Sequence, residues 1–261
     1  MGAADIGTAG LVAGYLLLLI PLGILLWLRI PLVGQTLLSV ARMTVQLLFV
    51  GFYLQFLFEL DDWRLTILWL VVMIVVADIS ILRSTRLCLR CFAGPLFFSL
   101  AAGTVLPLLF FTGLLLHLPR WMTAQYAIPI AGMILGNCLR ADIIGIRTFY
   151  DAIRRSKRDY LRRLAAGASH AEAVRPYLRD AVSAALAPTI AAMATMGLVA
   201  LPGMMTGVIL GGSDPMTAIQ YQIAILIAIF SGTALTVTAA ILLTLRSAFT
   251  PAGTLDPSIF R

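Results

Sequence analysis

The residues of this chain that could do chemistry are few, and they lie between or inside long apolar segments. Ser169 and Glu172 form the S-x-x-E pattern of a capping box, which satisfies two backbone N–H groups at the start of a helix. Cys88 and Cys91 form a C-x-x-C pair, which can bind a metal or undergo redox chemistry, although a structural zinc site needs two further ligands. We favour the simpler interpretation, two cysteines at a helix end.

Motifs for catalysis are absent from the sequence. It contains no H-E-x-x-H, no G-x-S-x-G and no paired carboxylates within an apolar segment. A nucleotide-binding P-loop needs G-x-x-x-x-G-K-[ST], but Lys157 is the only lysine and it follows Ser156. We therefore expect a protein that is not an enzyme and that holds no cofactor of its own.

The composition indicates the class of protein. Hydrophobic residues make up 61% of the chain, charged residues only 12%, and the mean hydropathy is +0.98, whereas soluble domains carry about 25% charged residues. We expect an all-α polytopic membrane protein in which 1–261 form a single transmembrane domain. With about 20 apolar residues per span, seven transmembrane helices are predicted, at 11–28, 36–58, 65–82, 92–118, 124–146, 188–210 and 218–245.

Basic residues predict the orientation. Most of the 19 arginines and lysines flank one side of the predicted spans, and the positive-inside rule makes that side cytoplasmic. We therefore expect an integral plasma or inner membrane protein with its N-terminus outside and its C-terminus in the cytoplasm. The basic run at 154–163 holds one aromatic residue, Tyr160, and not the alternation of basic and aromatic residues typical of a nucleic-acid site. Anionic lipid headgroups are therefore its favoured contact, and no nucleic acid is expected.

The largest polar segment, 147–187, is expected to be a cytoplasmic coupling loop. Its first part is predicted to continue the fifth helix, with Gly167 as a C-cap. The capping box then starts a short helix that ends near Pro176 and lies parallel to the membrane. The candidate residues for coupling to a partner are Leu164, Gly167, Ala168, Ser169, Glu172 and Arg175.

Polar residues inside the predicted spans are costly and need a reason. Arg42 and Gln46 share a face of the second span, and Asp78 lies at similar depth in the third. An ion pair between Arg42 and Asp78 that fixes helix packing is the favoured interpretation, and a part in the substrate pathway is the alternative. Asn137 belongs to a polar cluster of the fifth span that also contains Cys138, Arg140 and Asp142.

Pro202 and Gly203 are predicted to break the sixth span. Such a break leaves backbone N–H and C=O groups without helical partners. In a membrane these groups are tolerated only where protein buries them or where they line a water-filled cavity. The methionines around this break could be soft ligands for a passing cation, or ordinary core residues, and no metal ligand is identified. The candidate translocation pathway is Arg42, Gln46, Asp78, Asn137, Met196, Pro202, Gly203, Met204 and Met205.

Several of these motifs resemble a known family. The stretch from Leu164 to Ser169, LAAGAS, resembles the coupling-helix signature of ABC transporter permeases. The strings LPGMMTG at 201–207 and D-P-x-x-A-I-x-Y-Q at 214–222, with IPIAGMILGN at 128–137, resemble the FetB-type (YbbM-like) permeases of bacterial iron export and their relatives in plant aluminium tolerance. The likeness extends over about 39–245.

The resemblance implies a transport function. It implies a permease subunit of an ABC transporter, ATP-driven export of metal ions with iron as first candidate, and a separate cytosolic ATPase of the FetA type that holds ATP and Mg²⁺. One coupling element per chain implies a homodimer of this chain. Two alternatives stay open: an ion- or proton-coupled secondary transporter, and an ABC permease for a non-metal solute such as a nucleotide sugar.

Overall fold

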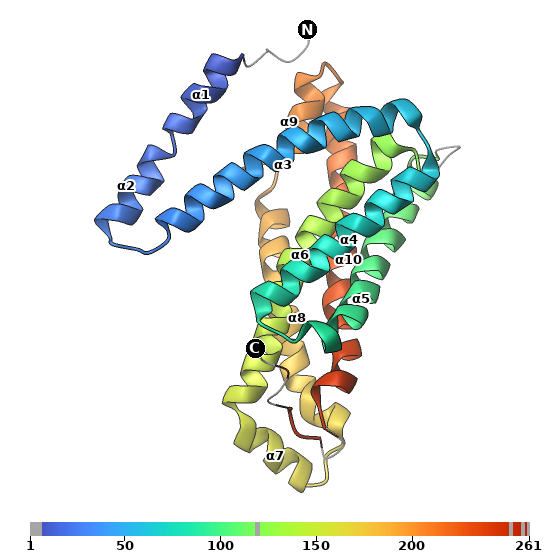
Figure 1. The fold of residues 1–261 in the computed structure, drawn as a ribbon. Coiled ribbons are helices and arrows are strands. Elements are labelled where there is room, and N and C mark those ends of the chain that lie inside the picture. Colours follow the sequence, from blue (N-terminus) through green and yellow to red (C-terminus); the bar gives the residue numbers. More distant parts are fainter. Residues whose placement is uncertain (1–6, 118–120, 251–252, 257–258, 260–261) are drawn as a thin grey trace.

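The protein is all-α in the computed structural model, which describes residues 7–117, 121–250, 253–256 and 259 (Figure 1). Within these ranges no β-strand forms. Six helical segments are long and apolar enough to cross a membrane, which confirms an all-α polytopic membrane protein. The helices are α1 (Thr8–Leu16), α2 (Leu19–Trp27), α3 (Val33–Leu60), α4 (Trp63–Thr85), α5 (Leu89–Leu109) with the π-helix η1 (Phe110–Leu115), α6 (Ala124–Arg155), α7 (Lys157–Ala165), α8 (His170–Thr195), α9 (Gly203–Leu210) and α10 (Pro215–Ala248).

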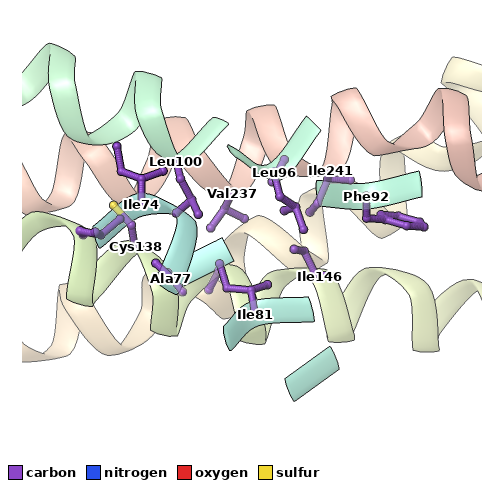
Figure 2. Close-up of a cluster of buried hydrophobic side chains, with 14 of the residues drawn as sticks. Ile74, Ala77, Ile81, Phe92, Leu96, Leu100, Cys138, Ile146, Val237 and Ile241 are labelled. Carbon is purple, nitrogen blue, oxygen red and sulfur yellow. The ribbon is translucent and has the colours of Figure 1, made fainter. Parts of the chain in front are cut away.

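The core is formed by α4, α5, α6, α8 and α10, which pack side by side. Figure 2 shows apolar side chains of four of these helices converging, among them Ile81 of α4, Leu96 of α5, Ile146 of α6 and Val237 of α10. α7 lies across one end of this bundle and α9 lies at the other (Figure 1). We refer to these as the α7 end and the α9 end.

Glycines bring three of the core helices into close contact. A Cβ atom added to Gly232 of α10 would lie 2.5 Å from the carbonyl oxygen of Gly103 on α5. One added to Gly145 of α6 would lie 2.7 Å from a methyl carbon of Val237 on α10. By contrast, a Cβ at Gly136, which is four residues after Gly132 in a G-x-x-x-G pattern, would meet nothing within 4 Å.

The N-terminal helices stand apart from the core (Figure 1). Among the residues of α3, all of which the structure describes, only Leu57 is buried, against Ala124 and Ile128 of α6. Nearby, Tyr53 of α3 lies 4.4 Å from Trp69 of α4 between ring centroids. α3 thus touches the bundle near its C-terminal end and leaves it along the rest of its length.

The helix boundaries correct the predicted organisation of 146–210. α6 ends at Arg155 and α7 is a separate short helix, so the fifth helix does not run on to 166. α8 begins at the capping box but passes through Pro176 and Pro188 to Thr195, so the expected short helix ending near Pro176 is wrong. Ala173, Ala181 and Ala185 bury the first part of α8, which contains Pro176, and this packing outweighs the cost of that proline; Pro188 lies in the more exposed C-terminal part of the helix. The predicted span 188–210 is therefore not one helix.

Candidate functional site

At the α7 end, α7 and the start of α8 form an elbow, residues 157–172. α7 buries Tyr160 and exposes most of its charged side chains. Gly167 then takes a φ of +91°, a conformation that glycine adopts without strain. Ala168 donates its N–H to the Arg163 carbonyl at 3.1 Å, and Gly167 donates to Leu164 at 3.0 Å. This pair of bonds is a Schellman motif, which closes the C-terminus of α7.

The capping box closes the other side of the elbow. Ser169 donates its backbone N–H and its hydroxyl to Glu172 Oε2, each at 2.8 Å, and Glu172 donates its N–H to Ser169 Oγ at 3.3 Å. These bonds from Ser169 lower the pKa of the Glu172 carboxyl. The predicted capping box is thus confirmed, whereas Gly167 closes α7 and not the continued fifth helix that the sequence predicts.

The C-terminal residues hold the elbow against the bundle. The Tyr160 hydroxyl donates to the Gly253 carbonyl at 2.6 Å, and the His170 ring meets the Phe249 ring edge-on with centroids 4.6 Å apart. His170 is half-buried, its Nε2 has no hydrogen-bond partner, and burial lowers its pKa. No local pattern in the sequence indicates this contact, because His170 and Phe249 are far apart in the chain.

The surface of the elbow is basic. Lys157, Arg158, Arg162 and Arg163 of α7 are exposed, and Arg162 lies 3.6 Å from Asp159 in an exposed ion pair. Of the other predicted coupling residues, Arg175 is exposed on α8 and Ala168 is half-buried. Leu164 packs against the core.

Beside the elbow, α4 and α6 enclose a cleft of about 400 Å³. Arg86, Arg147 and Arg154 line it together with Asp151, and Arg147 donates to the Ser84 carbonyl. The α7 end therefore offers a positive surface to whatever contacts it.

The break between α8 and α9 is longer than the sequence indicated. It begins after Thr195 rather than at Pro202, because Gly197 takes a φ of +87° and donates its N–H to the Ala200 carbonyl at 3.0 Å. Pro202 is the N-cap of α9 and Gly203 its first residue. Leu198 is 92% exposed on this chain. Irregular backbone at membrane depth must be covered by protein or face a cavity.

Gln222 ties this break to α10. It is buried, and its Nε2 donates to the Met196 sulfur at 3.9 Å. Met204 packs against the core from α9, and Met205 is half-buried. Gln222 was visible in the sequence only as a polar residue in an apolar segment.

The structure does not bring the other predicted pathway residues together. Arg42 and Gln46 are exposed on α3, whereas Asp78 is 5% exposed on α4. The predicted ion pair between Arg42 and Asp78 does not form, because α3 leaves the bundle. Asn137 is half-buried and donates to the Met133 carbonyl at 2.8 Å. Within the described part of the chain, no three His, Cys, Asp or Glu side chains lie close enough to hold a metal ion.

Comparison with known proteins identifies related chains. The model of the Uncharacterised protein family UPF0014 matches residues 8–249. A UPF0014 membrane protein of Synechocystis is 34% identical over 205 residues, 78% of this chain and 79% of the relative. The Probable iron export permease protein FetB of Escherichia coli is 32% identical over 209 residues, covering 80% of this chain and 79% of its own. The Arabidopsis thaliana Protein ALUMINUM SENSITIVE 3 is 34% identical over 200 residues, which are 76% of this chain and 71% of that relative. No solved structure matches.

Proposed function

The chain belongs to the UPF0014 family, and on that premise we propose that it is the membrane-spanning subunit of an ABC transporter. A separate cytosolic ATPase of the FetA type binds ATP and Mg²⁺ and drives transport. The FetB relative is named as a probable iron export permease, so export of metal ions, with iron as first candidate, is the proposed activity. The metal is cargo, and this chain contributes no ATP site.

The observation that carries this proposal is the elbow. A permease must present its ATPase with a surface that keeps its shape under force. The C-terminus of α7 is capped by a Schellman motif and the N-terminus of α8 by a capping box, and both form within this chain. The exposed basic residues of α7 suit an acidic surface on the partner. The α7 end then faces the cytosol, which agrees with the positive-inside rule.

α8 connects the elbow to the membrane interior. It is one 26-residue helix that starts at the capping box and ends at the break before Met196. At about 1.5 Å per residue it extends roughly 39 Å, so movement of its first turn is carried along a single helix, past Pro176 and Pro188, to the break. We assign the coupling role to α7 and the first turns of α8, in place of the separate short helix expected at 169–175.

A second copy of this chain completes the transporter in this proposal. α3 carries Arg42 and Gln46 on a surface that its own chain leaves exposed, and Leu198 and Val199 of the break are 92% and 83% exposed. Polar side chains and irregular backbone are unfavourable against lipid. A homodimer would cover them and place a pathway between the copies, with Met196, Met204 and Met205 near it.

The experiment is an ATPase assay in proteoliposomes that hold this chain with the ABC ATPase encoded beside it. We expect stimulation by one of Fe²⁺, Mn²⁺, Zn²⁺, Al³⁺ or UDP-glucose, with Fe²⁺ first, and loss of stimulation in Gly167→Val. Stimulation by UDP-glucose alone would replace the metal by a nucleotide sugar. Failure of the chain to associate with any ATPase would refute the proposal.

A further inference from the structure

Asp142 is a carboxyl buried in the interior of the bundle. It is 0% exposed, and neither of its carboxyl oxygens has a hydrogen-bond partner. It lies on α6 within a membrane-spanning segment. A carboxylate there is strongly disfavoured unless a positive charge or a proton neutralises it. The question is which of the two is present.

In the part of the chain that the structure describes, no buried side chain supplies a positive charge. Among the residues that the structure describes, the buried ones include Asp78 and Asp142 but no Arg, Lys or His. Asp78, on α4, has no electrostatic contact with Asp142. The titratable neighbour of Asp142 is the Cys138 thiol, one turn earlier on α6. From α8 and α10, the residues packed at this level of α6 include Ala185 and Val237, which are uncharged.

The hydrogen bonds around Thr236 favour a protonated carboxyl. The Thr236 side chain lies beside both Asp142 and Cys138, but its hydroxyl donates its single proton to the Thr233 carbonyl at 3.2 Å. What remains on this hydroxyl is acceptor capacity. A protonated Asp142 can donate to Thr236 Oγ1 while the bond from Thr236 to Thr233 is kept, whereas an ionised Asp142 could accept from Thr236 only if the hydroxyl turned away from the Thr233 carbonyl.

The close contact of the helices argues against a metal ion at the same place. A Cβ on Gly232 would lie 2.5 Å from the Gly103 carbonyl oxygen and 3.5 Å from the Cys138 sulfur. Backbone and side-chain atoms thus fill the space between α5, α6 and α10 beside Cys138, one turn before Asp142 on α6. A proton requires no added volume.

We propose that Asp142 is a proton-binding site that releases and regains its proton during transport. When α6 and α10 separate, the O–H bond of Asp142 breaks, the proton passes to entering water, and a carboxylate remains. When the helices close, the carboxylate takes a proton back. The only ligand of this site is a proton, and its release and return need no oxidant or further reactant.

α8 links this site to the elbow. A Cβ on Gly145, one turn from Asp142 on α6, would lie 3.3 Å from the Ala185 Cβ of α8. α8 begins at the capping box, so a shift of the elbow reaches the contact that encloses Asp142. The coupling of proton release to transport rests on the proposed function, whereas the protonation of Asp142 does not.

The protonation is tested by infrared spectroscopy of the full chain in lipid. A protonated carboxyl has its own C=O band, which shifts in D₂O. We expect such a band at neutral pH, reduced in Asp142→Asn and retained in Asp180→Asn, which changes an exposed carboxyl of α8. Asp78→Asn separates the contribution of the other buried carboxyl. A band unchanged in Asp142→Asn, or one that Fe²⁺ or Zn²⁺ abolishes, would overturn the protonation.

Thr236→Val keeps the folded protein and the carboxyl but removes the acceptor. It should shift the band by changing its hydrogen bonding, and it decides the question if Asp142→Asn does not fold. An unshifted band in Thr236→Val would then count against the proposal.

The proton cycle is tested in the complex with the ATPase. We expect a non-hydrolysable ATP analogue to reduce the Asp142 band, and ATP-driven transport to vary several-fold with pH in the wild type but not in Asp142→Asn. If the Asp142 band is unchanged by the ATP analogue while ATP-driven transport proceeds, the proposed proton cycle is wrong. Absence of ATP-driven transport in the wild type would count against the proposed function, while the infrared result still decides the protonation.

Discussion

Glu172 accepts the backbone N–H and the hydroxyl of Ser169 through the same carboxylate oxygen, each at 2.8 Å. Because the pKa of Glu172 is lowered in the folded protein, its contribution to the cap is present above the ordinary value of 4.5 and is lost as the pH falls through the lowered one.

We expect the amide of Ser169 to lose protection from hydrogen exchange at acidic pH. Glu172→Gln keeps an acceptor that a capping box can use and should remove this pH dependence. Ser169→Ala should lower helix stability by about 1 kcal/mol at all pH values. If the protection of the Ser169 amide still depends on pH in Glu172→Gln, another titrating group causes the effect.

Gly167 is the position where a side chain should separate ATP hydrolysis from transport. Its φ of +91° strains a β-branched residue, by about 1–3 kcal/mol for such conformations, and distorts the elbow. No atom lies within 4 Å of an added Cβ, so the effect is conformational rather than steric. We expect Gly167→Val to retain membrane insertion and to lose transport per ATP, while Gly167→Asn, which tolerates a positive φ better, keeps more of it. Equal transport in both variants and the wild type would show that the elbow does not transmit movement.

His170 and Phe249 should make the C-terminal contact sensitive to acid. The pKa of His170 is lowered by burial, so the neutral ring stabilises the contact above its ordinary value of 6.5, and the stabilisation is lost as the pH falls through the lowered one. We expect the protection of the Phe249 amide, its exchange rate relative to that of an unstructured amide at the same pH, to fall in mildly acidic buffer. His170→Asn should abolish the dependence, and His117→Asn, at the other histidine, should leave it intact.

Gly232 should tolerate no side chain. Its added Cβ would meet the Gly103 carbonyl at 2.5 Å, and backbone atoms cannot move aside as a flexible side chain can. We expect Gly232→Ala to lower the free energy of unfolding by about 1–3 kcal/mol, as overpacking does. The measurement is the thermal unfolding midpoint in detergent, which should fall. Gly136→Ala, where a Cβ meets nothing, is the matched control. An unaffected midpoint in Gly232→Ala would mean that α5 and α10 are farther apart than described.

Features that depend on a few neighbouring residues were predictable from the sequence. Apolar segments of about 20 residues imply helices because lipid offers no partners for backbone groups. Gly167 and the Ser169–Glu172 pair were recognised because each cap is made within one turn. Pro202 marked the break, although Gly197, which begins it, was overlooked among other glycines.

Features that depend on helix tilt were not predictable. Arg42 and Asp78 have similar calculated depths, but hydropathy does not specify tilt or rotation, and α3 carries Arg42 away from α4. The same reason explains why Gly103 and Gly232, which have no G-x-x-x-G partner, make the closest helix contact. Asp142 was visible as a polar residue in a span, yet its isolation from cations could be recognised only in three dimensions.

The capped helix ends at Gly167 and Ser169 affect the entropy change when an ATPase docks on the elbow. Ordering a flexible residue costs about 1–2 kcal/mol of backbone entropy, and a loop that became ordered only on docking would lose that entropy in the complex. Here it is lost when the chain folds. An ATPase that docks on the elbow therefore meets a rigid surface, and we expect an association rate set by charge, sensitive to salt, with little of the heat-capacity change that accompanies coupled folding.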